Sequence, residues 1–246
     1  MKKSIIAAIH QPNFLPWLGF FDKIVRADIF IFLDHTSTRT TTAAWTKRVQ
    51  VICNQSPCWL TVPLKQNIGL EGLGPINEMR ISGEEKYRDK HLKTIRHNYG
   101  KSPFYDKTLG LLDYFYNFES DFIAKKNISF VTKLCEHLEI NRTFIKSSEL
   151  NCKKSSTELM AEICQKVGAD TYLYGIGAAT NYQENEILEE AGIKPMEQNF
   201  VHPVYNQFNL PEFIKGLSII DVLMNCGIEG TKRLINGNIP NSVAGI

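Results

Sequence analysis

The 246-residue sequence lacks the features that mark membrane and exported proteins. No stretch approaches the roughly 20 apolar residues of a membrane-spanning helix. Two lysines and a short apolar run over residues 5–9 open the chain, but His10 and Gln11 interrupt this run before it reaches the length of a secretory signal. We therefore expect a cytoplasmic protein with no membrane span.

An excess of charge of one sign is also missing, because 28 lysines and arginines face 26 aspartates and glutamates, for a net charge of +2. This balance predicts no general nucleic-acid binding, although it is compatible with a local basic patch. The six cysteines include no C-x-x-C pair, and no Cys/His cluster has the spacing of zinc ligands. Cys53 and Cys58 lie closest and would form a disulfide only in an oxidising compartment. We expect six reduced thiols and no metal site.

Hydrophobic residues make up 43% of the chain and charged residues 22%, as in an ordinary folded protein. The length fits one α/β domain with an excursion, or two small domains that share a cleft. No repeat or low-complexity linker is visible. We expect an N-terminal α/β part with a ligand loop (residues 1–84), a helical subdomain (85–142) and a C-terminal α/β part that completes the core (143–246).

The first part of the chain has the pattern of a βαβ unit. Residues 4–9 form a strand-like run, residues 18–25 have helical periodicity, and residues 28–34 form the continuous apolar run of a buried parallel strand. The whole stretch has the size of one βαβ unit. The loop before the helix then lies at the carboxyl end of the sheet, where open α/β sheets bind ligands.

The remaining pattern predicts a Rossmann-like parallel sheet core with an inserted β-hairpin region and a helical subdomain. Strands are expected at residues 48–53, 59–64, 76–82, 144–145 and 171–174. Helices are expected at residues 85–99, 103–118, 121–138 and 157–167, in a segment ending near residue 191, and in two short pieces around Phe213 and Thr231.

The first loop carries an unusual set of residues. Pro12 and Pro16 stiffen it, and it presents polar and aromatic groups at a strand end: His10, Gln11, Asn13 and Trp17. Such a loop suits the binding of a planar or phosphorylated compound. The alternative is a rigid strand-to-helix connection with Trp17 packed in the core.

Further polar residues follow the second strand. Asp34 and His35 end it, where a carboxylate and an imidazole can act as general acid and base; the alternative is a turn-stabilising Asp beside an exposed His. Trp45, Lys47 and Arg48 come next. An arginine matches phosphate geometry bidentately and a lysine adds a point charge, whereas the alternative is a strand with exposed cations.

Two late segments carry the remaining candidates. Gly175 opens a glycine-containing stretch whose backbone amides would form an anion site at a helix start, and Tyr182 is expected to face the same cleft. His202, Tyr205 and Gln207 belong to a rigid polar segment suited to sugar hydroxyls, with a structural turn as the alternative. We expect this segment, the Gly175 loop and the first loop to converge on one cleft.

The pattern of the first loop and the strands after it resembles the WbqC-like family. The matching positions are Gln11, Pro12, Pro16, Trp17, Gly19, Phe21, Asp22, Lys23, Asp34, Trp45 and Arg48. The likeness continues through residues 59–63, the helix that contains His91, and residues 172–175 and 203–207, so that it covers nearly the whole chain.

The resemblance implies an enzyme of O-antigen (lipopolysaccharide) biosynthesis. The implied reaction transfers an aminoacyl group, glycine in particular, to a 4-amino-4,6-dideoxy sugar linked to a nucleotide, dTDP. The partners would be this nucleotide-linked amino sugar and an amino-acid donor that stays open among an acyl adenylate, acyl-CoA and aminoacyl-tRNA. No cofactor is certain, and ATP is an option.

Within that reaction each candidate residue has an expected role. An unperturbed histidine titrates near 6.5, so His10 is the first choice of base, with His35 and His202 behind it. Asn13 or amides of residues 175–178 would stabilise the oxyanion. Lys47 and Arg48 would hold the pyrophosphate, and Trp17 or Trp45 would stack on a ring.

A second resemblance leaves other functions open. Residues 16–20 lie where HIGH-motif nucleotidyltransferases keep Pro-His-x-Gly-His, but Trp17 and Phe20 replace both histidines. One alternative is therefore a nucleotidyltransferase or ATP-dependent amide ligase. The other is a sugar-nucleotide-binding protein without catalytic activity.

Overall fold

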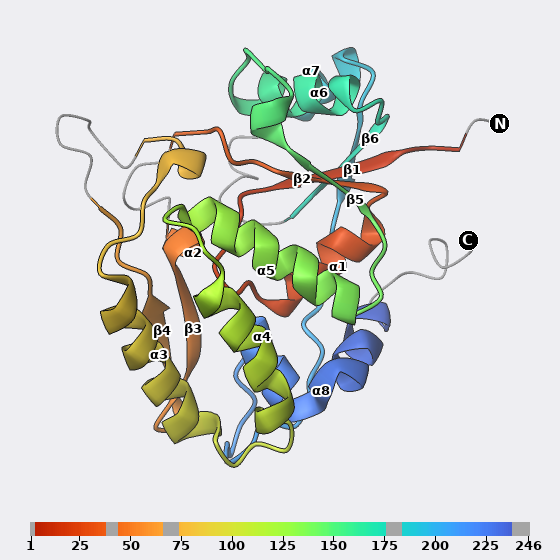
Figure 1. Ribbon diagram of the computed structural model, residues 1–246. Coiled ribbons are helices and arrows are strands. Elements are labelled where there is room, and N and C mark those ends of the chain that lie inside the picture. The colour runs from red at the N-terminus through yellow and green to blue at the C-terminus, as the bar shows by residue number, and fades with distance from the viewer. Residues whose placement is uncertain (1–2, 38–43, 66–73, 176–183, 238–246) are drawn as a thin grey trace.

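The fold is that of a computed structural model, which describes residues 3–37, 44–65, 74–175 and 184–237. A five-stranded parallel sheet with the strand order β5-β2-β1-β6-β7 lies at its centre (Figure 1). The strands are β1 (Ile6–His10), β2 (Ile29–Phe32), β5 (Thr143–Lys146), β6 (Thr171–Tyr174) and β7 (Lys194–Glu197). The predicted α/β class with a parallel sheet core is confirmed.

The predicted βαβ unit is present at the start of the chain. Helix α1 (Leu18–Arg26) connects β1 to β2, and the two strands pair in parallel, with Ala7 opposite Ile29. On its other side β1 pairs with β6, so that the connection from β1 leads to β2 on one side and the connection from β6 leads to β7 on the other. The carboxyl ends of β1 and β6 therefore form the topological switch point, the position where open α/β sheets bind ligands.

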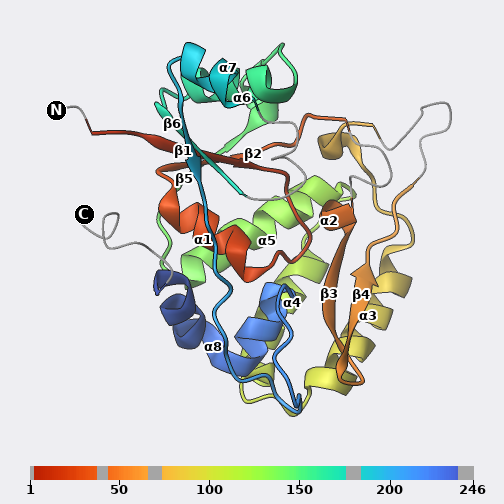
Figure 2. The ribbon, with the colours of Figure 1, turned by 180° about the vertical axis from the view of Figure 1, so that it is seen from behind.

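Both faces of the sheet are covered by helices. Helices α6 (Ser156–Lys166) and α7 (Asn185–Glu190) lie on one face, and α1 and α5 (Ile123–His137) lie on the other (Figures 1 and 2). Along β2, Phe30 and Phe32 join the apolar cluster on the side of α1, whereas Ile31 joins the cluster on the side of α6. Burial on both faces is why the strands read as continuous apolar runs.

The middle of the chain builds a second layer beyond α1. Helix α2 (Ala44–Lys47) leads into an antiparallel hairpin of β3 (Arg48–Cys53) and β4 (Ser56–Thr61), followed by α3 (Glu84–Tyr99), α4 (Tyr105–Asn117) and α5. Residues of all three predicted parts share one apolar cluster, which includes Phe20, Phe115 and Leu173. No helix in the described ranges is long and apolar enough to cross a membrane.

The prediction and the structure differ at three places. The strand expected at residues 76–82 is wrong, because Ile76–Glu78 is a 3-10 helix. After it only isolated β-bridges form. Ile81 N donates to the Asp121 carbonyl and not to a neighbouring strand. The end of the chain forms one kinked helix, α8 (Ile219–Asn236), instead of two pieces, and no helix forms at Phe213. Strand β7 was not predicted, because its four residues include lysine, proline and glutamate.

The expectation of six reduced cysteines is also wrong. Cys53 and Cys58 form a disulfide across the hairpin, with their Cα atoms 5.7 Å apart. The turn between β3 and β4 brings them together, since Asn54 and Gln55 both have positive φ, at 49° and 63°. The other four cysteines are free.

The kink of α8 yields a prediction about stability. Gly227 interrupts the helix at φ 66° and ψ −178°, and a Cβ added there would lie 2.6 Å from a ring carbon of Phe104. We expect Gly227→Ala to lower the free energy of unfolding by about 2 kcal/mol or more, because this backbone region is almost exclusive to glycine. The measurement is urea unfolding followed by circular dichroism.

Gly110 provides the matched control. It lies in α4, and a Cβ added there would meet no atom within 4 Å. Gly110→Ala should therefore raise the free energy of unfolding by about 0.5–1 kcal/mol, the difference in helix propensity. Equal effects of the two substitutions would show that Gly227 is not required for the kink.

Candidate functional site

Three segments distant in the sequence meet at the switch point. His10 ends β1, Gly175 follows β6, and α1 contributes Lys23. A Cβ added at Gly175 would lie 3.6 Å from Lys23 Nζ and 3.3 Å from Oε1 of Gln198, the residue that follows β7. Lys23 and Gln198 are 5% and 7% exposed. His10 and Gly175, at the ends of β1 and β6, thus both lie near Lys23, whereas the rest of the loop after Gly175 lies outside the described residues.

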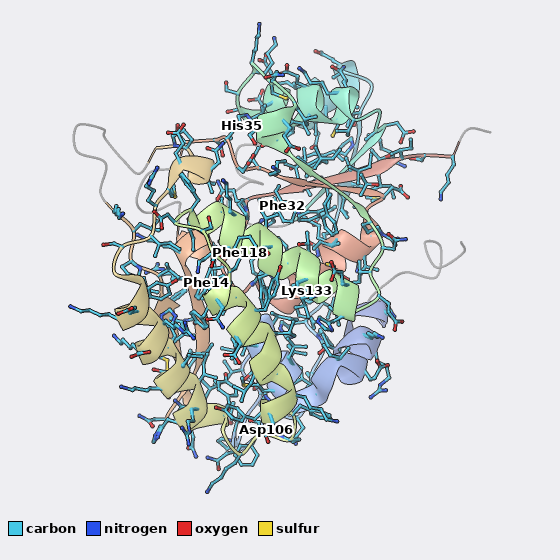
Figure 3. All side chains as sticks on the ribbon, viewed as in Figure 1. Phe14, Phe32, His35, Asp106, Phe118 and Lys133 are labelled. Carbon is cyan, nitrogen blue, oxygen red and sulfur yellow. A yellow bond between two sulfur atoms is a disulfide. The ribbon has the colours of Figure 1, made fainter. Side chains whose placement is uncertain are left out.

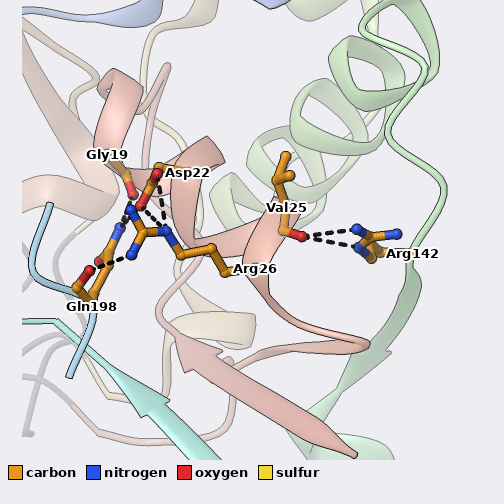
Figure 4. A network of polar contacts seen from close by, with 6 residues as sticks. All are labelled: Gly19, Asp22, Val25, Arg26, Arg142 and Gln198. Carbon is orange, nitrogen blue, oxygen red and sulfur yellow. Dashed lines mark hydrogen bonds and ion pairs between the residues drawn. The ribbon is translucent and has the colours of Figure 1, made fainter. Parts of the chain in front are cut away.

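A polar network fixes α1 against this edge of the sheet (Figure 4). Gln198 Nε2 donates to the Gly19 carbonyl at 2.7 Å and to Asp22 Oδ2 at 2.8 Å. Arg26 forms a 3.0 Å ion pair with Asp22 and donates to the Gln198 carbonyl at 2.6 Å. Burial raises the pKa of Asp22, and the contacts with Gln198 and Arg26 oppose this rise. The carboxylate is thus satisfied on the side of β7.

Lys23, the next residue, has no such partner. Among the described residues, no hydrogen bond or ion pair involves its ammonium, and burial lowers its pKa to about 8. A buried charge without a partner is costly, by several kcal/mol in general. The ammonium group is therefore available to a ligand at the switch point.

His10 is held as a neutral imidazole. Burial, followed by the nearby charge of Lys23, lowers its pKa to about 3, against the opposing effect of a hydrogen bond with the Gln11 carbonyl. His10 Nδ1 lies 3.0 Å from that carbonyl oxygen, which only accepts, so Nδ1 carries the proton and Nε2 keeps a free lone pair. The expected pKa near 6.5 is therefore wrong for the ligand-free protein, whereas the role of His10 as base stays a prediction.

All three tryptophans of the chain form one row that starts at His10. The ring centroids are 5.8 Å apart between His10 and Trp17, 5.7 Å between Trp17 and Trp45, and 5.6 Å between Trp45 and Trp59. The Arg48 guanidinium lies 4.3 Å from the centroid of the Trp59 ring and ends the row. Trp45 and Trp59 are each 41% exposed. We call these four rings and Arg48 the aromatic row.

Buried polar atoms without partners lie beside the aromatic row. Asn13 is 2% exposed, yet neither atom of its amide has a hydrogen-bond partner, and the same holds for Thr46 Oγ1 and Arg48 Nε. The segment is close to the row because Phe14 N donates to the Trp45 carbonyl at 2.9 Å. Buried polar groups are normally hydrogen-bonded, so the Asn13 amide is a candidate to bind a polar ligand group next to the tryptophans.

Asp34 and His35 lie at the carboxyl edge of the sheet but bond to the turn after β5. Asp34 Oδ1 accepts from Ser148 N at 2.9 Å, and Oδ2 accepts from Ser148 Oγ at 2.8 Å. His35 Nδ1 lies 2.6 Å from Ser147 Oγ. These are the contacts of the turn-stabilising alternative, and the acid–base role of the two residues stays a prediction.

The segment at residues 202–207 packs against α8. Tyr205 and Gln207 donate to Asp221 Oδ2 at 2.6 and 3.0 Å, and Tyr99 donates to Oδ1 at 2.9 Å. His202 lies against Tyr205, with its Nδ1 2.9 Å from the Pro203 carbonyl. The structure thus places the hydroxyl of Tyr205 and the amide of Gln207 in a buried network, not beside His10.

The sequence of the chain resembles known proteins over nearly its whole length. The sequence profile of the WbqC-like protein family matches residues 11–233, from Gln11 in the first loop to the last turn of α8. The chain belongs to the WbqC-like family. The uncharacterized protein Rv1507c of Mycobacterium tuberculosis is 27% identical over 237 residues, which cover 95% of this chain and 98% of that protein. No solved structure matches the chain.

In this WbqC-like protein, the remaining predicted site residues lie in different positions. Lys47 ends α2 directly before Arg48, and Gln11 holds the imidazole through its carbonyl. Tyr182 lies outside the described residues. Sequence reasoning missed two residues at the switch point. Lys23 was detectable as a lysine within the apolar face of α1, whereas no local signal marks Gln198.

A groove of about 1080 Å³ lies elsewhere on this WbqC-like protein. It runs between the β3–β4 turn, the C-terminal half of α3 and the start of α4, and it is lined by Arg96, Lys101 and Asp106. Figure 3 shows Asp106 at the end of the molecule opposite His35. We assign the functional site by its chemistry instead of by volume, because no residue of the switch point or the aromatic row lines this groove.

The neutral state of His10 predicts acid sensitivity. Since the folded-state pKa is about 3 and the unfolded value is about 6.5, the unfolded chain binds the extra proton as the pH falls through this window, and stability is lost. We expect wild type to lose up to about 2 kcal/mol more than His10→Asn between pH 7 and pH 5. Urea unfolding at both pH values measures this difference. Equal losses would mean that His10 is accessible to protons in the folded state.

Proposed function

We propose that this protein transfers an aminoacyl group, glycine in particular, to the amino group of a nucleotide-linked (dTDP) 4-amino-4,6-dideoxy sugar in O-antigen biosynthesis. The aromatic row is the observation that carries the proposal. Membership of the WbqC-like family supports it.

The aromatic row suits a linear ligand made of rings and phosphates. Exposed rings stack on nucleobases at about 1–3 kcal/mol per base, and Trp45 and Trp59 are each partly exposed. Arg48 at the far end offers a guanidinium that pairs with phosphate oxygens, with Lys47 beside it. A nucleotide-linked sugar combines a nucleobase, a pyrophosphate and a sugar ring, and we propose that its amino sugar lies near Trp17 and His10.

The chemistry requires that the sugar amine attack the donor carbonyl. A C–N bond forms, the bond to the donor's leaving group breaks, and the amine gives up a proton. His10 Nε2 has the free lone pair to accept that proton, because the Gln11 carbonyl fixes the hydrogen on Nδ1. The unpartnered amide of Asn13 is suited to donate to the oxyanion. The proposed proton acceptor and the proposed oxyanion donor are thus both side chains of this protein.

The low pKa of His10 favours one alternative, a sugar-nucleotide-binding protein without catalysis. An imidazole with a pKa of about 3 is a weak proton acceptor near neutral pH. Binding of the nucleotide-linked sugar without turnover, across acyl adenylate, acyl-CoA and aminoacyl-tRNA donors, would favour this alternative.

Arg48→Ala tests the binding part of the proposal. Loss of a charge-assisted contact should weaken binding of a dTDP-linked amino sugar by about 1.5–3 kcal/mol, roughly 10- to 150-fold, in calorimetry. Arg80→Ala is the matched control, because the Arg80 guanidinium also lies over a ring, 4.7 Å from that of Phe122, but outside the aromatic row. Equal affinities of wild type and Arg48→Ala would remove Arg48 from the site.

His10→Asn tests the catalytic part. The substitution keeps size and some hydrogen bonding, so we expect a folded variant that still binds the sugar nucleotide but turns over at least about 100-fold more slowly. Turnover and melting temperature are measured together. A lower melting temperature with normal turnover per folded molecule would make His10 a structural residue.

A further inference from the structure

Two lysines are buried among the residues that the structure describes, and only one of them has a hydrogen-bond partner. Lys126, 1% exposed in α5, donates to the Tyr116 carbonyl at 3.3 Å and lies 5.8 Å from the Phe115 ring centroid. Lys23, 5% exposed in α1, has no partner among the residues that the structure describes. Lysines are almost never buried unless they are paired, so we expect Lys23 to be satisfied by a group other than the described residues.

The surroundings of Lys23 indicate the charge of that group. On the sides that the described residues define, the ammonium faces the neutral imidazole of His10, the Gly175 backbone and the uncharged Oε1 side of Gln198. Asp22, the adjacent carboxylate, forms its ion pair with Arg26. The site therefore offers one positive charge and no opposing negative one, which suits an anion.

The absence of a side chain at Gly175 lets the ammonium lie close to the strand end. A Cβ at that position would lie 3.6 Å from Lys23 Nζ and 3.3 Å from Oε1 of Gln198. Lys23 therefore lies at the edge where parallel sheets bind ligands. A lysine acts as a point charge for phosphate, whereas a carboxylate is more often matched by the fork of an arginine.

We propose that Lys23 is the centre of a phosphate subsite that holds the leaving group of a phosphate-activated aminoacyl donor, an acyl adenylate. The inference rests on the proposed function and narrows its donor. Lys23 adjoins His10, the end of the aromatic row where the amine is expected, while Arg48 serves the nucleotide of the acceptor at the other end. Of the donors considered, an acyl adenylate alone leaves as a phosphate directly from the reacting carbonyl.

The step balances with the residues named. The sugar amine attacks the carbonyl of the mixed anhydride, the C–N bond forms and the C–O bond to the phosphate of AMP breaks. The electron pair leaves on the phosphate oxygen beside Lys23, and the amine proton passes to His10 Nε2. A bound phosphate also offsets the charge of Lys23, the second cause of the low pKa of His10, so it makes the imidazole more basic.

The test compares AMP with adenosine in calorimetry on the whole protein. Wild type should bind AMP more tightly than adenosine, and Lys23→Met should lose at least about 10-fold in AMP affinity with no loss for adenosine. Lys126→Met, which removes the other buried lysine, should keep the AMP affinity. Gly175→Ala, which narrows the space beside Nζ without removing a charge, should also weaken AMP binding.

The outcomes separate this inference from the proposed function. Equal binding of AMP and adenosine by wild type, or unchanged AMP affinity in both Lys23→Met and Gly175→Ala, overturns the subsite. Transfer from acyl-CoA but not from an acyl adenylate overturns the assigned donor. If AMP affinity depends on Lys23 but no donor yields an acylated sugar, the subsite holds and the proposed function fails. If dTDP-sugar binding depends on Arg48 but AMP does not bind, the reverse is true.

Discussion

The pairing of β1 with β2 on one side and with β6 on the other determines where the functional groups lie. Because every connection in a parallel sheet must cross back over a face, the connections from β1 to β2 and from β6 to β7 lead in opposite directions, and the carboxyl ends of β1 and β6 form the switch point. His10 is the last residue of β1 and Gly175 is the first residue after β6, so both lie at this position. The rest of the site is arranged around them, with α1 below and the aromatic row extending away from the sheet.

Helix α1 contributes residues both to the apolar core and to the switch point. Phe20, Phe21 and Ile24 fill the apolar cluster beneath the sheet, and the two charged residues between them, Asp22 and Lys23, have opposite fates. The carboxylate forms an ion pair with Arg26 of the same helix and accepts a hydrogen bond from the Gln198 amide after β7, whereas the ammonium lies near the strand ends. One turn of α1 therefore carries both a paired charge, which anchors the helix, and the ammonium of Lys23, which we propose binds the ligand.

The elements defined by local patterns were predictable, and those defined by distant contacts were not. The apolar runs of β1 and β2 and the periodicity of α1 identify the βαβ unit, because burial on two faces leaves a clear local pattern. Apolar spacing at residues 76–82 resembled a strand, but pairing depends on a neighbour that the sequence does not reveal. The partners of Tyr205 and Gln207 include Asp221, which lies on a helix later in the chain. The isolation of Lys23 is likewise visible only when every nearby carboxylate has been placed.

The aromatic row has an optical consequence. Since the only three tryptophans of the chain belong to it, the indole absorption and emission of the whole protein originate in one region. Neighbouring indoles at 5.6–5.7 Å also exchange excitation energy efficiently, so quenching at any one ring reports on all three. The protein therefore carries a built-in, label-free chromophore array at the place where its ligand is expected, with no background from tryptophans in other parts of the fold.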